Sequence, residues 1–310
     1  MINKKKDLNS RKLADSSFNI IFKYLPAEII PYIKLSRFDR PIGIWLLMLP
    51  AWWSISISLS FENETKGIIL YVYFFLGALV MRGAGCTFND LIDMKLDSEV
   101  KRTSNRPLPS GEVTIFQALL WLIFQSLVGF LILIQFNSQT IFFGLFSLLL
   151  VAIYPFMKRI TWWPQFFLGL AFNFGVILAW VEINNQISPI CIIVYLAGIF
   201  WTLGYDTIYA LMDIKDDRLV GIKSSAIYIG ERKIKLYLSI FYTFTFGLLF
   251  YSSLLIDVEW FFWPIFLISS SQLAWQIITL KPEASDDCLK KFKSNSIFGF
   301  AIFFCFVAGN

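Results

Sequence analysis

Residues 67–97 read GIILYVYFFLGALVMRGAGCTFNDLIDMKLD, and this stretch decides the fold. From Gly67 to Phe88 it carries one charged side chain, that of Arg82, and a run of acidic side chains follows. About 20 apolar residues are enough for a helix to cross the roughly 30 Å of hydrocarbon in a bilayer. The stretch is therefore predicted to be a transmembrane helix that ends in an acidic motif.

The composition extends this conclusion to the whole chain. Of 310 residues, 57% are hydrophobic and only 16% are charged, which is too little polar surface for a soluble globule of this length. We expect an all-α, polytopic bundle of nine transmembrane helices, because only helices satisfy the backbone of such spans in lipid. The expected spans are Gly43–Ser60, Gly67–Phe88, Val113–Phe136, Thr140–Met157, Pro164–Val181, Pro189–Leu211, Ile234–Ile256, Trp260–Leu280 and Ser294–Gly309.

The basic residues predict how these spans are oriented, because short cytoplasmic loops retain Lys and Arg. With the N-terminus inside, the charged residues of the outside loops are Glu62, Glu64, Lys66, Glu182, Asp257 and Glu259. Lys66 is then the only one of 27 basic residues outside. This pattern favours an N-in, C-out protein, with the loops after the second and sixth spans forming a cap on the cytoplasmic side.

The chain is predicted to have a tail and one domain. Residues 1–42 are expected to be a basic tail without a signal peptide, and residues 43–310 a single membrane-embedded domain. Within the tail, Phe18–Arg40 mixes apolar and basic side chains, which favours an amphipathic segment on the membrane surface, interrupted at Pro26 and Pro31. Membrane lipid is the expected partner, and no nucleic acid partner is predicted.

The residue types available limit the chemistry. The chain has no histidine, which removes imidazole as a proton shuttle and as a metal ligand. Its four cysteines are not spaced as metal ligands, and they predict no disulfide frame either. Catalysis must therefore depend on carboxylates, basic residues, tyrosine and a hard metal ion.

The first acidic motif has the pattern of a Mg²⁺ site. Asn89, Asp93 and Asp97 are four residues apart, so they share one face of a helix, and Asp90 lies beside them. Mg²⁺ prefers one or two carboxylates, retained waters and phosphate oxygens. A solvated helix end with incidental acids is the alternative interpretation, but acids at this spacing repel one another.

A second acidic motif follows the sixth expected span, where residues 204–217 read GYDTIYALMDIKDD. Asp206, Tyr209, Asp213 and Asp217 are three, four and four residues apart, which again predicts one helical face. Acids at the ends of spans are costly unless they are paired or bound to metal. On the predicted topology both motifs lie on the same side of the membrane, where Mg²⁺ and a diphosphate would complement them.

Five stretches between about residues 35 and 232 carry a family pattern: Arg37–Leu47, Arg82–Asp97, Arg102–Gly111, Tyr154–Arg159 with Trp163–Gln165, and Gly204–Ala210 with Asp213–Ser225. The NDxxDxxxD run resembles that of the UbiA superfamily of intramembrane prenyltransferases. GYDTIYA followed by DxxDD and GxKSSA resembles its bacterial hydroxybenzoate branch. Met212 and Ile214 stand where that branch more often has polar residues, and neither departure removes a candidate ligand.

The resemblance implies a role for each matching residue. The implied Mg²⁺ ligands are Asn89, Asp90, Asp93, Asp97, Asp213 and Asp217, with Asp206 and Asp216 as supports. The implied catalytic residues are Asp93, Asp213, Asp217 and Lys158. The implied diphosphate contacts are Tyr154, Lys158, Tyr209 and Lys223, while Arg40 and Arg82 are expected to bind diphosphate or the carboxylate of the acceptor.

The resemblance also implies a reaction and a location. A polyprenyl group is expected to move from polyprenyl diphosphate to the ring of 4-hydroxybenzoate, ortho to the hydroxyl, in ubiquinone synthesis at the cytoplasmic face of a bacterial inner membrane. Heme, homogentisate, dihydroxynaphthoate or chlorophyllide are the alternative acceptors. An ion-coupled transporter would also use intramembrane acids, but near the midplane. A scaffold is disfavoured because it would have no use for two costly acidic motifs.

Overall fold

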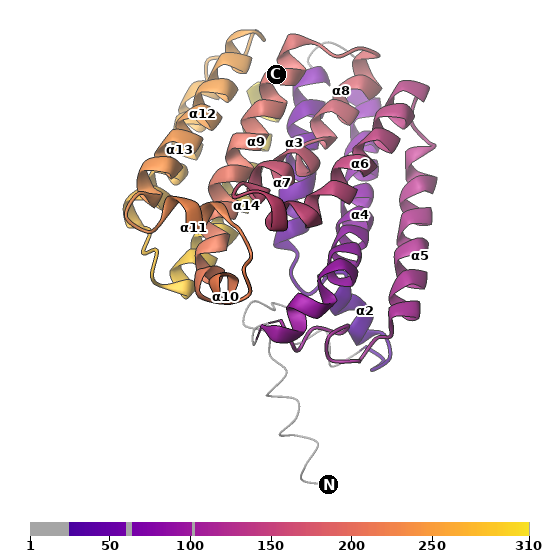
Figure 1. Ribbon diagram of the computed structural model, residues 1–310. Helices are drawn as coiled ribbons and strands as arrows, with labels where there is room; N and C mark the ends of the chain where they lie inside the picture. Colours follow the sequence, from indigo (N-terminus) through magenta and orange to yellow (C-terminus); the bar gives the residue numbers. More distant parts are fainter. Residues whose placement is uncertain (1–24, 60–63, 101–102, 310) are drawn as a thin grey trace. The chain divides into compact units, whose positions relative to one another are not determined.

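The computed structural model describes residues 25–59, 64–100 and 103–309, and every regular element in these ranges is helical (Figure 1). The predicted all-α class is therefore confirmed. The chain divides into two compact units, which we call the smaller unit and the larger unit. The smaller unit comprises the chain up to Gly43 and Leu79–Phe130, and the larger unit comprises Ile44–Ala78 and the chain from Leu131 onward.

The smaller unit contains α2 (Ile30–Leu35), the second half of α4 (Glu64–Glu99) and most of α5 (Ile115–Leu133). Pro31 lies in the first turn of α2, where proline fits because that turn leaves backbone N–H groups unbonded. It therefore begins a helix instead of interrupting one. The part of the predicted amphipathic tail before residue 25 lies outside the described residues.

Buried polar side chains join the three helices of the smaller unit. The hydroxyl of Ser36 accepts hydrogen bonds from Trp121 Nε1 at 2.8 Å and Gln125 Nε2 at 3.0 Å. Thr87 Oγ1 donates to Gln125 Oε1 at 3.2 Å. A Cβ at Gly83 would collide with the amide nitrogen of Gln125. Glycine at this position therefore permits the close approach of α5 to α4.

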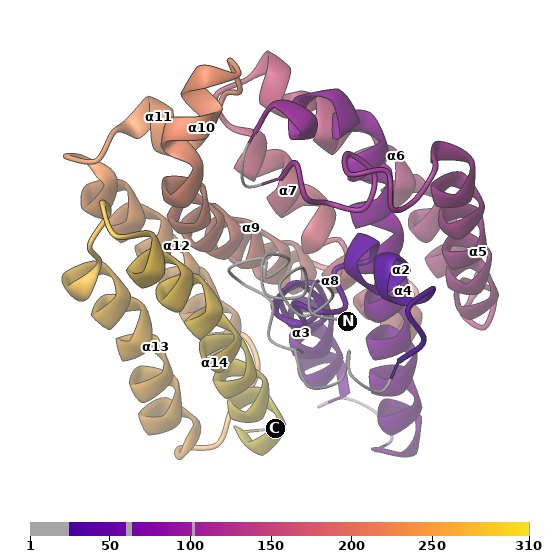
Figure 2. The same ribbon diagram turned by 90° about the horizontal axis from the view of Figure 1, so that it is seen from below.

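The larger unit is built around α9, which contacts α7, α8, α11, α12 and α14. Figure 2 shows α12, α13 and α14 beside one another on one side of α9. The larger unit contains most of α3 (Ile42–Leu59) and the first half of α4. Its other elements are α6 (Ser138–Ile160), α7 (Pro164–Phe172), α8 (Gly175–Asn184), α9 (Pro189–Ala210), the 3₁₀ turn η2 (Leu211–Asp213), α10 (Ile214–Leu219), α11 (Ser225–Ile229), α12 (Ile234–Leu254), α13 (Phe262–Thr279) and α14 (Ser285–Gly309).

Helix α3 is the most deeply buried apolar helix of the larger unit, and hydrogen bonds fix it to its neighbours. Trp53 Nε1 donates to the carbonyl of Gly299 on α14 at 2.8 Å, and the Trp53 ring packs against Trp201 of α9. Ser54 Oγ donates to the carbonyl of Val176 on α8 at 2.8 Å. These bonds satisfy polar groups that have no water partner in a buried helix.

The expected span Pro164–Val181 is broken into α7 and α8. The side-chain amide of Asn173 donates to Gly169 O and to Thr202 Oγ1, each at 2.8 Å. A buried asparagine that bonds to its own preceding turn competes with the helical hydrogen bonds, which accounts for a break at this position. The apolar residues around Asn173 gave no sign of this break.

Eight helices in the described residues are long and apolar enough to cross a membrane. The expected span that is not among these eight is Trp260–Leu280, and it corresponds to α13, an 18-residue helix without charged side chains whose three serines and two glutamines lower its hydropathy. Two other helices are longer than the spans expected for them. α4 continues to Glu99 and α14 begins at Ser285, because charged residues end an apolar span without ending a helix.

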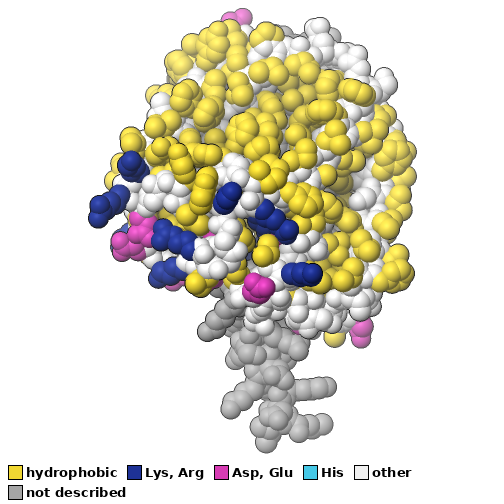
Figure 3. All heavy atoms as spheres, in the orientation of Figure 1, with side chains coloured by type: hydrophobic (Ala, Val, Ile, Leu, Met, Phe, Trp, Pro, Cys, Tyr) yellow, Lys and Arg dark blue, Asp and Glu magenta, His cyan; other side chains and the backbone are white. Residues whose placement is uncertain are grey.

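Charged side chains of the larger unit are unevenly distributed. On the face shown in Figure 3 they gather mainly where α10 and α11 lie, while the sides of the long helices are mostly hydrophobic and show almost no charged side chains. Many large hydrophobic side chains on these helices are exposed. For example, Phe142 on α6 is 66% exposed and Ile268 on α13 is 72% exposed. Such a surface is compatible with lipid and is far larger than a soluble monomer exposes.

Candidate active site

The first acidic motif lies on a continuous helix. α4 extends through Glu99, so Asn89, Asp93 and Asp97 occupy successive turns of one helix instead of the cap loop that was expected. Asp93 is 1% exposed and Asp97 8% exposed. The predicted spacing on one helical face is confirmed by this helix.

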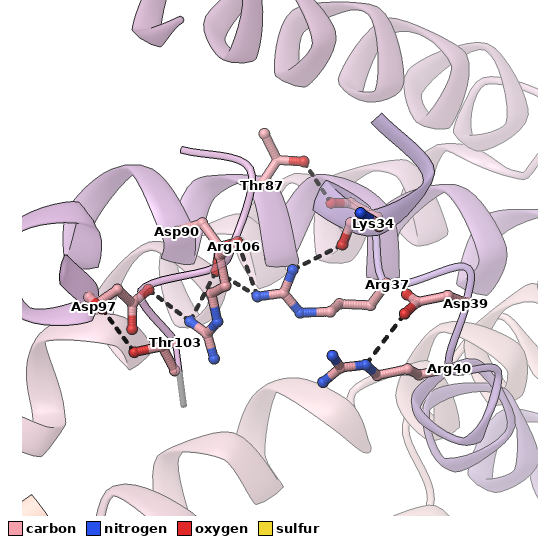
Figure 4. A network of polar contacts seen from close by, with 10 residues as sticks. Lys34, Arg37, Asp39, Arg40, Thr87, Asp90, Asp97, Thr103 and Arg106 are labelled. Atoms are coloured by element: carbon pink, nitrogen blue, oxygen red, sulfur yellow. Dashed lines mark hydrogen bonds and ion pairs between the residues drawn. The ribbon is translucent and has the colours of Figure 1, made fainter. Parts of the chain in front are cut away.

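Two arginines bind two acids of this motif (Figure 4). Arg37 Nη2 donates to both carboxylate oxygens of Asp90, at 2.7 and 2.8 Å. Arg106 Nη1 donates to Asp90 Oδ1 at 3.2 Å and to Asp97 Oδ2 at 2.6 Å. Asp90 is fully buried, so its charge is compensated entirely by these cations.

The backbone at Arg37 is unusual. Its φ angle is 57°, in the left-handed region that glycine normally occupies. The Phe38 N–H donates to Ile33 O and the Arg37 N–H to Lys34 O, which is the Schellman pattern that ends a helix. A side chain in this conformation costs about 1–2 kcal/mol. The Arg37 guanidinium offsets this cost through its bonds to Asp90 and to the carbonyl of Lys34.

Burial and neighbouring charges shift the pKa of Arg37 in opposite directions. Burial by itself would lower the pKa of this guanidinium, but the charge of Asp90 and smaller contributions from Cys86, the hydrogen bond to Asp90 and Asp39 together outweigh burial and raise the pKa above its ordinary value. Arg37 is therefore permanently charged. At Asp39, burial raises the pKa of the carboxyl, although Arg40 and Arg37 act in the opposite direction.

The two predicted anion-binding arginines, Arg40 and Arg82, belong to the smaller unit. Arg40 Nε donates to Asp39 Oδ2 at 3.4 Å. The guanidinium of Arg82 lies against the backbone of Gly43, where an added Cβ would collide with it. Gly43 is therefore a position at which the absence of a side chain makes room for a predicted site residue.

The second acidic motif does not share one helical face. Asp206 and Tyr209 lie on α9, which ends at Ala210, Asp213 lies in the 3₁₀ turn η2, and Asp217 lies on α10. A 3₁₀ turn advances the chain with three residues per turn, so the four-residue spacing from Tyr209 to Asp213 no longer aligns the two side chains. The single face expected here is wrong for that reason.

The segment Gly221–Ser225 fixes the second motif to α6. The Ile222 N–H donates to Asp217 O at 2.9 Å, and the Lys223 N–H donates to Lys158 O at 2.8 Å. The Lys223 ammonium donates to Ile160 O at 3.0 Å and lies 5.7 Å from the centre of the Trp162 ring. The sequence therefore identified two lysines, Lys158 and Lys223, that come together at the end of α6.

Two further side chains hold the same segment from the other side. The Ser225 N–H donates to Gln165 Oε1 at 3.1 Å, and the Ser225 hydroxyl is 2.7 Å from that of Thr207. Gln165, Thr207 and Ser225 are all buried. Sequence reasoning quoted Gln165 and Ser225 within family stretches but gave them no role.

The remaining predicted contacts lie in the larger unit. Tyr154 and Lys158 are four residues apart on α6, so they share a helical face. Tyr209 is half-buried, and its ring is 4.7 Å from that of Phe292 on α14. The four cysteines are free and buried, as expected for small apolar side chains.

The donor set fits a hard divalent cation. Asn89 and Asp93 on α4, and Asp213 and Asp217 around η2, offer only oxygen atoms. Within the described residues, no three Asp, Glu or Cys side chains gather into a group that could hold a metal by themselves. Such pairs of oxygen ligands suit an ion like Mg²⁺, which fills most of its positions with water and phosphate oxygens.

Known proteins resemble this chain along most of its length. Residues 47–304 match the UbiA prenyltransferase family. The mitochondrial 4-hydroxybenzoate polyprenyltransferase of Arabidopsis thaliana is 44% identical over 92% of this chain and 70% of its own length. The 4-hydroxybenzoate geranyltransferase 1 of Lithospermum erythrorhizon is 41% identical over 90% of each chain.

Solved structures share the fold. A UbiA homologue from Aeropyrum pernix K1 superimposes with a TM-score of 0.71 at 17% identity, covering 84% of this chain and 96% of the other. A UbiA homologue from Archaeoglobus fulgidus bound to DMAPP and Mg²⁺ gives 0.65 at 19% identity, covering 89% and 98%. At such identities the likeness concerns the fold alone.

Proposed function

Because this chain belongs to the UbiA prenyltransferase family, we propose that it transfers a polyprenyl group from polyprenyl diphosphate to 4-hydroxybenzoate, ortho to the hydroxyl, in ubiquinone synthesis. It is an aromatic prenyltransferase and a multi-pass membrane protein. The similarity to hydroxybenzoate enzymes over 92% of the chain is the observation that carries the choice of acceptor.

The two acidic motifs support the proposed metal dependence. Asn89 and Asp93 of the smaller unit, and Asp213 and Asp217 of the larger unit, are the proposed Mg²⁺ ligands. When bound, Mg²⁺ would neutralise the charge that develops on the leaving diphosphate. Carboxylates close together repel one another, so a divalent ion at these positions would also relieve their repulsion.

Basic and phenolic side chains are proposed to bind the diphosphate. Lys158 would place its ammonium on the diphosphate oxygens, and Tyr154, one turn away on the same helix, would donate its hydroxyl. Tyr209 is proposed as a third contact. Lys223 is left out of this set, because its ammonium already donates to a backbone carbonyl.

Arg40 and Arg82 are proposed to bind an anionic group of a substrate, either diphosphate or the benzoate carboxylate. A guanidinium matches the planar carboxylate geometry and stays charged at any working pH. Orienting the ring in this way would present the carbon ortho to the hydroxyl to the allylic carbon as its bond to oxygen breaks. The ring proton then leaves to a carboxylate, to the diphosphate or to water, which restores aromaticity.

The cellular location is also part of the proposal. The charge asymmetry of the loops supports an N-in, C-out arrangement in the bacterial cytoplasmic membrane, with the reaction on the cytoplasmic side. Several of the relatives are named as mitochondrial. Because the four native cysteines are buried, single cysteines introduced into the loops and labelled from either side of sealed vesicles would test the orientation.

The test of the function is direct. Membranes containing the protein are supplied with labelled 4-hydroxybenzoate, a polyprenyl diphosphate and Mg²⁺, and the expected product is prenylated hydroxybenzoate that disappears when EDTA is added and returns with Mg²⁺. Homogentisate, dihydroxynaphthoate and heme serve as competing acceptors. Turnover of one of these in place of 4-hydroxybenzoate would overturn the acceptor. Uptake of a solute into vesicles with no product would overturn the enzyme class.

A further inference from the structure

We infer that Asp90 is a positioning residue that anchors Arg37 and Arg106, and that Asp90 is not a metal ligand. This inference deepens the proposed function and rests on it, because it separates a residue of the first motif that binds arginine from the residues that are proposed to bind the metal. All the residues concerned lie in the smaller unit.

Both oxygens of Asp90 are already occupied. Oδ1 accepts from Arg37 and Arg106, and Oδ2 accepts from Arg37, at distances between 2.7 and 3.2 Å. The side chain is fully buried. A divalent cation on these oxygens would lie beside two permanently charged guanidinium groups and would be repelled by them, since the low dielectric of a buried site strengthens the repulsion.

The geometry of α4 places Asp90 at one end of the motif. With 3.6 residues per turn, Asn89, Asp93, Asp97 and Asp90 follow one another around the helix axis in steps of about 40°, 40° and 20°. Arg106 bridges Asp90 and Asp97, so one nitrogen spans two turns of the helix. Asp90 therefore lies about 60° from Asp93 around the helix axis, on the side where the arginines bind, and Asp97 lies between them.

The anchored arginines position two connections. Arg37 lies in the turn that follows α2, three residues before Arg40. Arg106 lies in the turn after α4, where Thr103 Oγ1 donates to Asp97 O at 2.9 Å. Asp90 thus ties the segment that carries Arg40, and the segment that follows the motif, to the same two turns of α4 that carry Asp93.

The side-chain bonds of Arg37 stabilise its position, whereas its backbone conformation is unfavourable. Its φ of 57° suits glycine, so Arg37→Gly keeps the turn and removes the ion pair, while Arg37→Ala removes the ion pair and keeps the strain. Comparison of these two variants separates the effect of the guanidinium from that of the backbone.

The experiment compares Arg37→Gly, Arg37→Ala and Asp90→Asn with Asp93→Asn, all in the full-length protein. Misplacement of a catalytic group by about 1 Å can cost about 100-fold. We therefore expect kcat to fall about 10- to 100-fold in the first three variants, while the Mg²⁺ concentration for half-maximal activity stays within about twofold of wild type. Asp93→Asn should raise that concentration at least about tenfold. A comparable rise in Asp90→Asn, or wild-type activity in Arg37→Gly, would overturn the inference.

A double variant keeps the test decisive when activity is low. If Arg37 and Asp90 act as a unit, Arg37→Gln with Asp90→Asn should lose no more activity, and no more thermal stability, than the worse single variant. Additive losses in thermal unfolding would overturn the ion pair as the anchor. This measurement needs no turnover, so a wild-type protein that fails to prenylate 4-hydroxybenzoate would refute the proposed function and leave the anchor separately testable.

Discussion

The two acidic motifs are held in place by different means. Asp93 lies on an uninterrupted helix, and its neighbours Asp90 and Asp97 are bound by two arginines. Asp213 and Asp217 lie on a 3₁₀ turn and a six-residue helix, and hydrogen bonds made by the following segment, including one from the Lys223 ammonium, hold this region in place. A single long helix positions the side chains of the first motif, whereas a short helical segment held by hydrogen bonds positions those of the second.

This difference teaches which perturbations each motif should tolerate. Breaking a buried ion pair by removing one partner costs about 3–5 kcal/mol, whereas leaving a buried amide without its partner costs about 1–3 kcal/mol. The first motif should therefore be sensitive to charge, and the second to loss of single hydrogen bonds. The predictions that follow test this contrast.

The largest effect is expected from the proposed metal ligands themselves. Asp93→Ala and Asp213→Ala should each lower kcat by about 100- to 1,000-fold, because each removes a charge that helps to hold the metal at the leaving group. The measurement is product formation with labelled acceptor. Lys95→Ala and Lys215→Ala, exposed neighbours on α4 and α10, are the matched controls and should retain activity. Full turnover in either aspartate variant would break the assignment.

A smaller effect on kcat is expected from loss of the hydrogen bond between Gln165 and Ser225, which holds the segment that follows the second motif. Gln165→Leu leaves the buried Ser225 N–H without an acceptor, at a cost of about 1–3 kcal/mol, so local opening should rise about tenfold and kcat should fall by a similar factor. Hydrogen exchange should quicken in residues 221–229 and stay unchanged in α4. Gln165→Glu, which keeps an acceptor oxygen, should restore slow exchange. Equal acceleration in both motifs would show that they are not held independently.

A displaced side chain should matter less than a deleted one. Gly43→Ala pushes the guanidinium of Arg82 from its place, so we expect the KM for one substrate to rise about fivefold, or about 1 kcal/mol of binding. Steady-state kinetics with each substrate varied in turn would show which one Arg82 binds. Gly85→Ala, where an added Cβ meets nothing within 4 Å, is the control. Unchanged KM values for both substrates would remove Arg82 from the site.

The smallest effect is expected at Lys223. Its ammonium donates to the carbonyl of Ile160, the last residue of α6. This arrangement is worth about 0.3–1 kcal/mol, so Lys223→Met should change the KM for polyprenyl diphosphate by less than about threefold. The matched comparison is Lys158→Met, where we expect a much larger rise. A tenfold rise at Lys223 would restore it to the diphosphate contacts that the family resemblance implied.

The helical class, most of the spans and the single face of the first acidic motif could be predicted from the sequence, because hydropathy and four-residue spacing are local properties. The shape of the second motif could not, because the 3₁₀ turn at Leu211–Asp213 interrupts that spacing. The ends of α4 and α14 were misjudged, since a helix continues past the charges that end its apolar span. The break at Asn173 depends on Thr202, a residue on another helix. The arginine partners of Asp90 were also beyond local reasoning, because Arg37 lies 53 residues earlier in the chain.

The left-handed turn at Arg37 has a consequence for how the protein matures. Arg37 is synthesised well before Asp90, the residue that compensates its strained conformation. The turn after α2 can therefore adopt its stable conformation only after α4 has been synthesised and inserted in the bilayer, because contacts between residues distant in sequence form only once the intervening chain is present. Formation of the ion pairs of Asp90 would thus be a late step in the folding of the smaller unit.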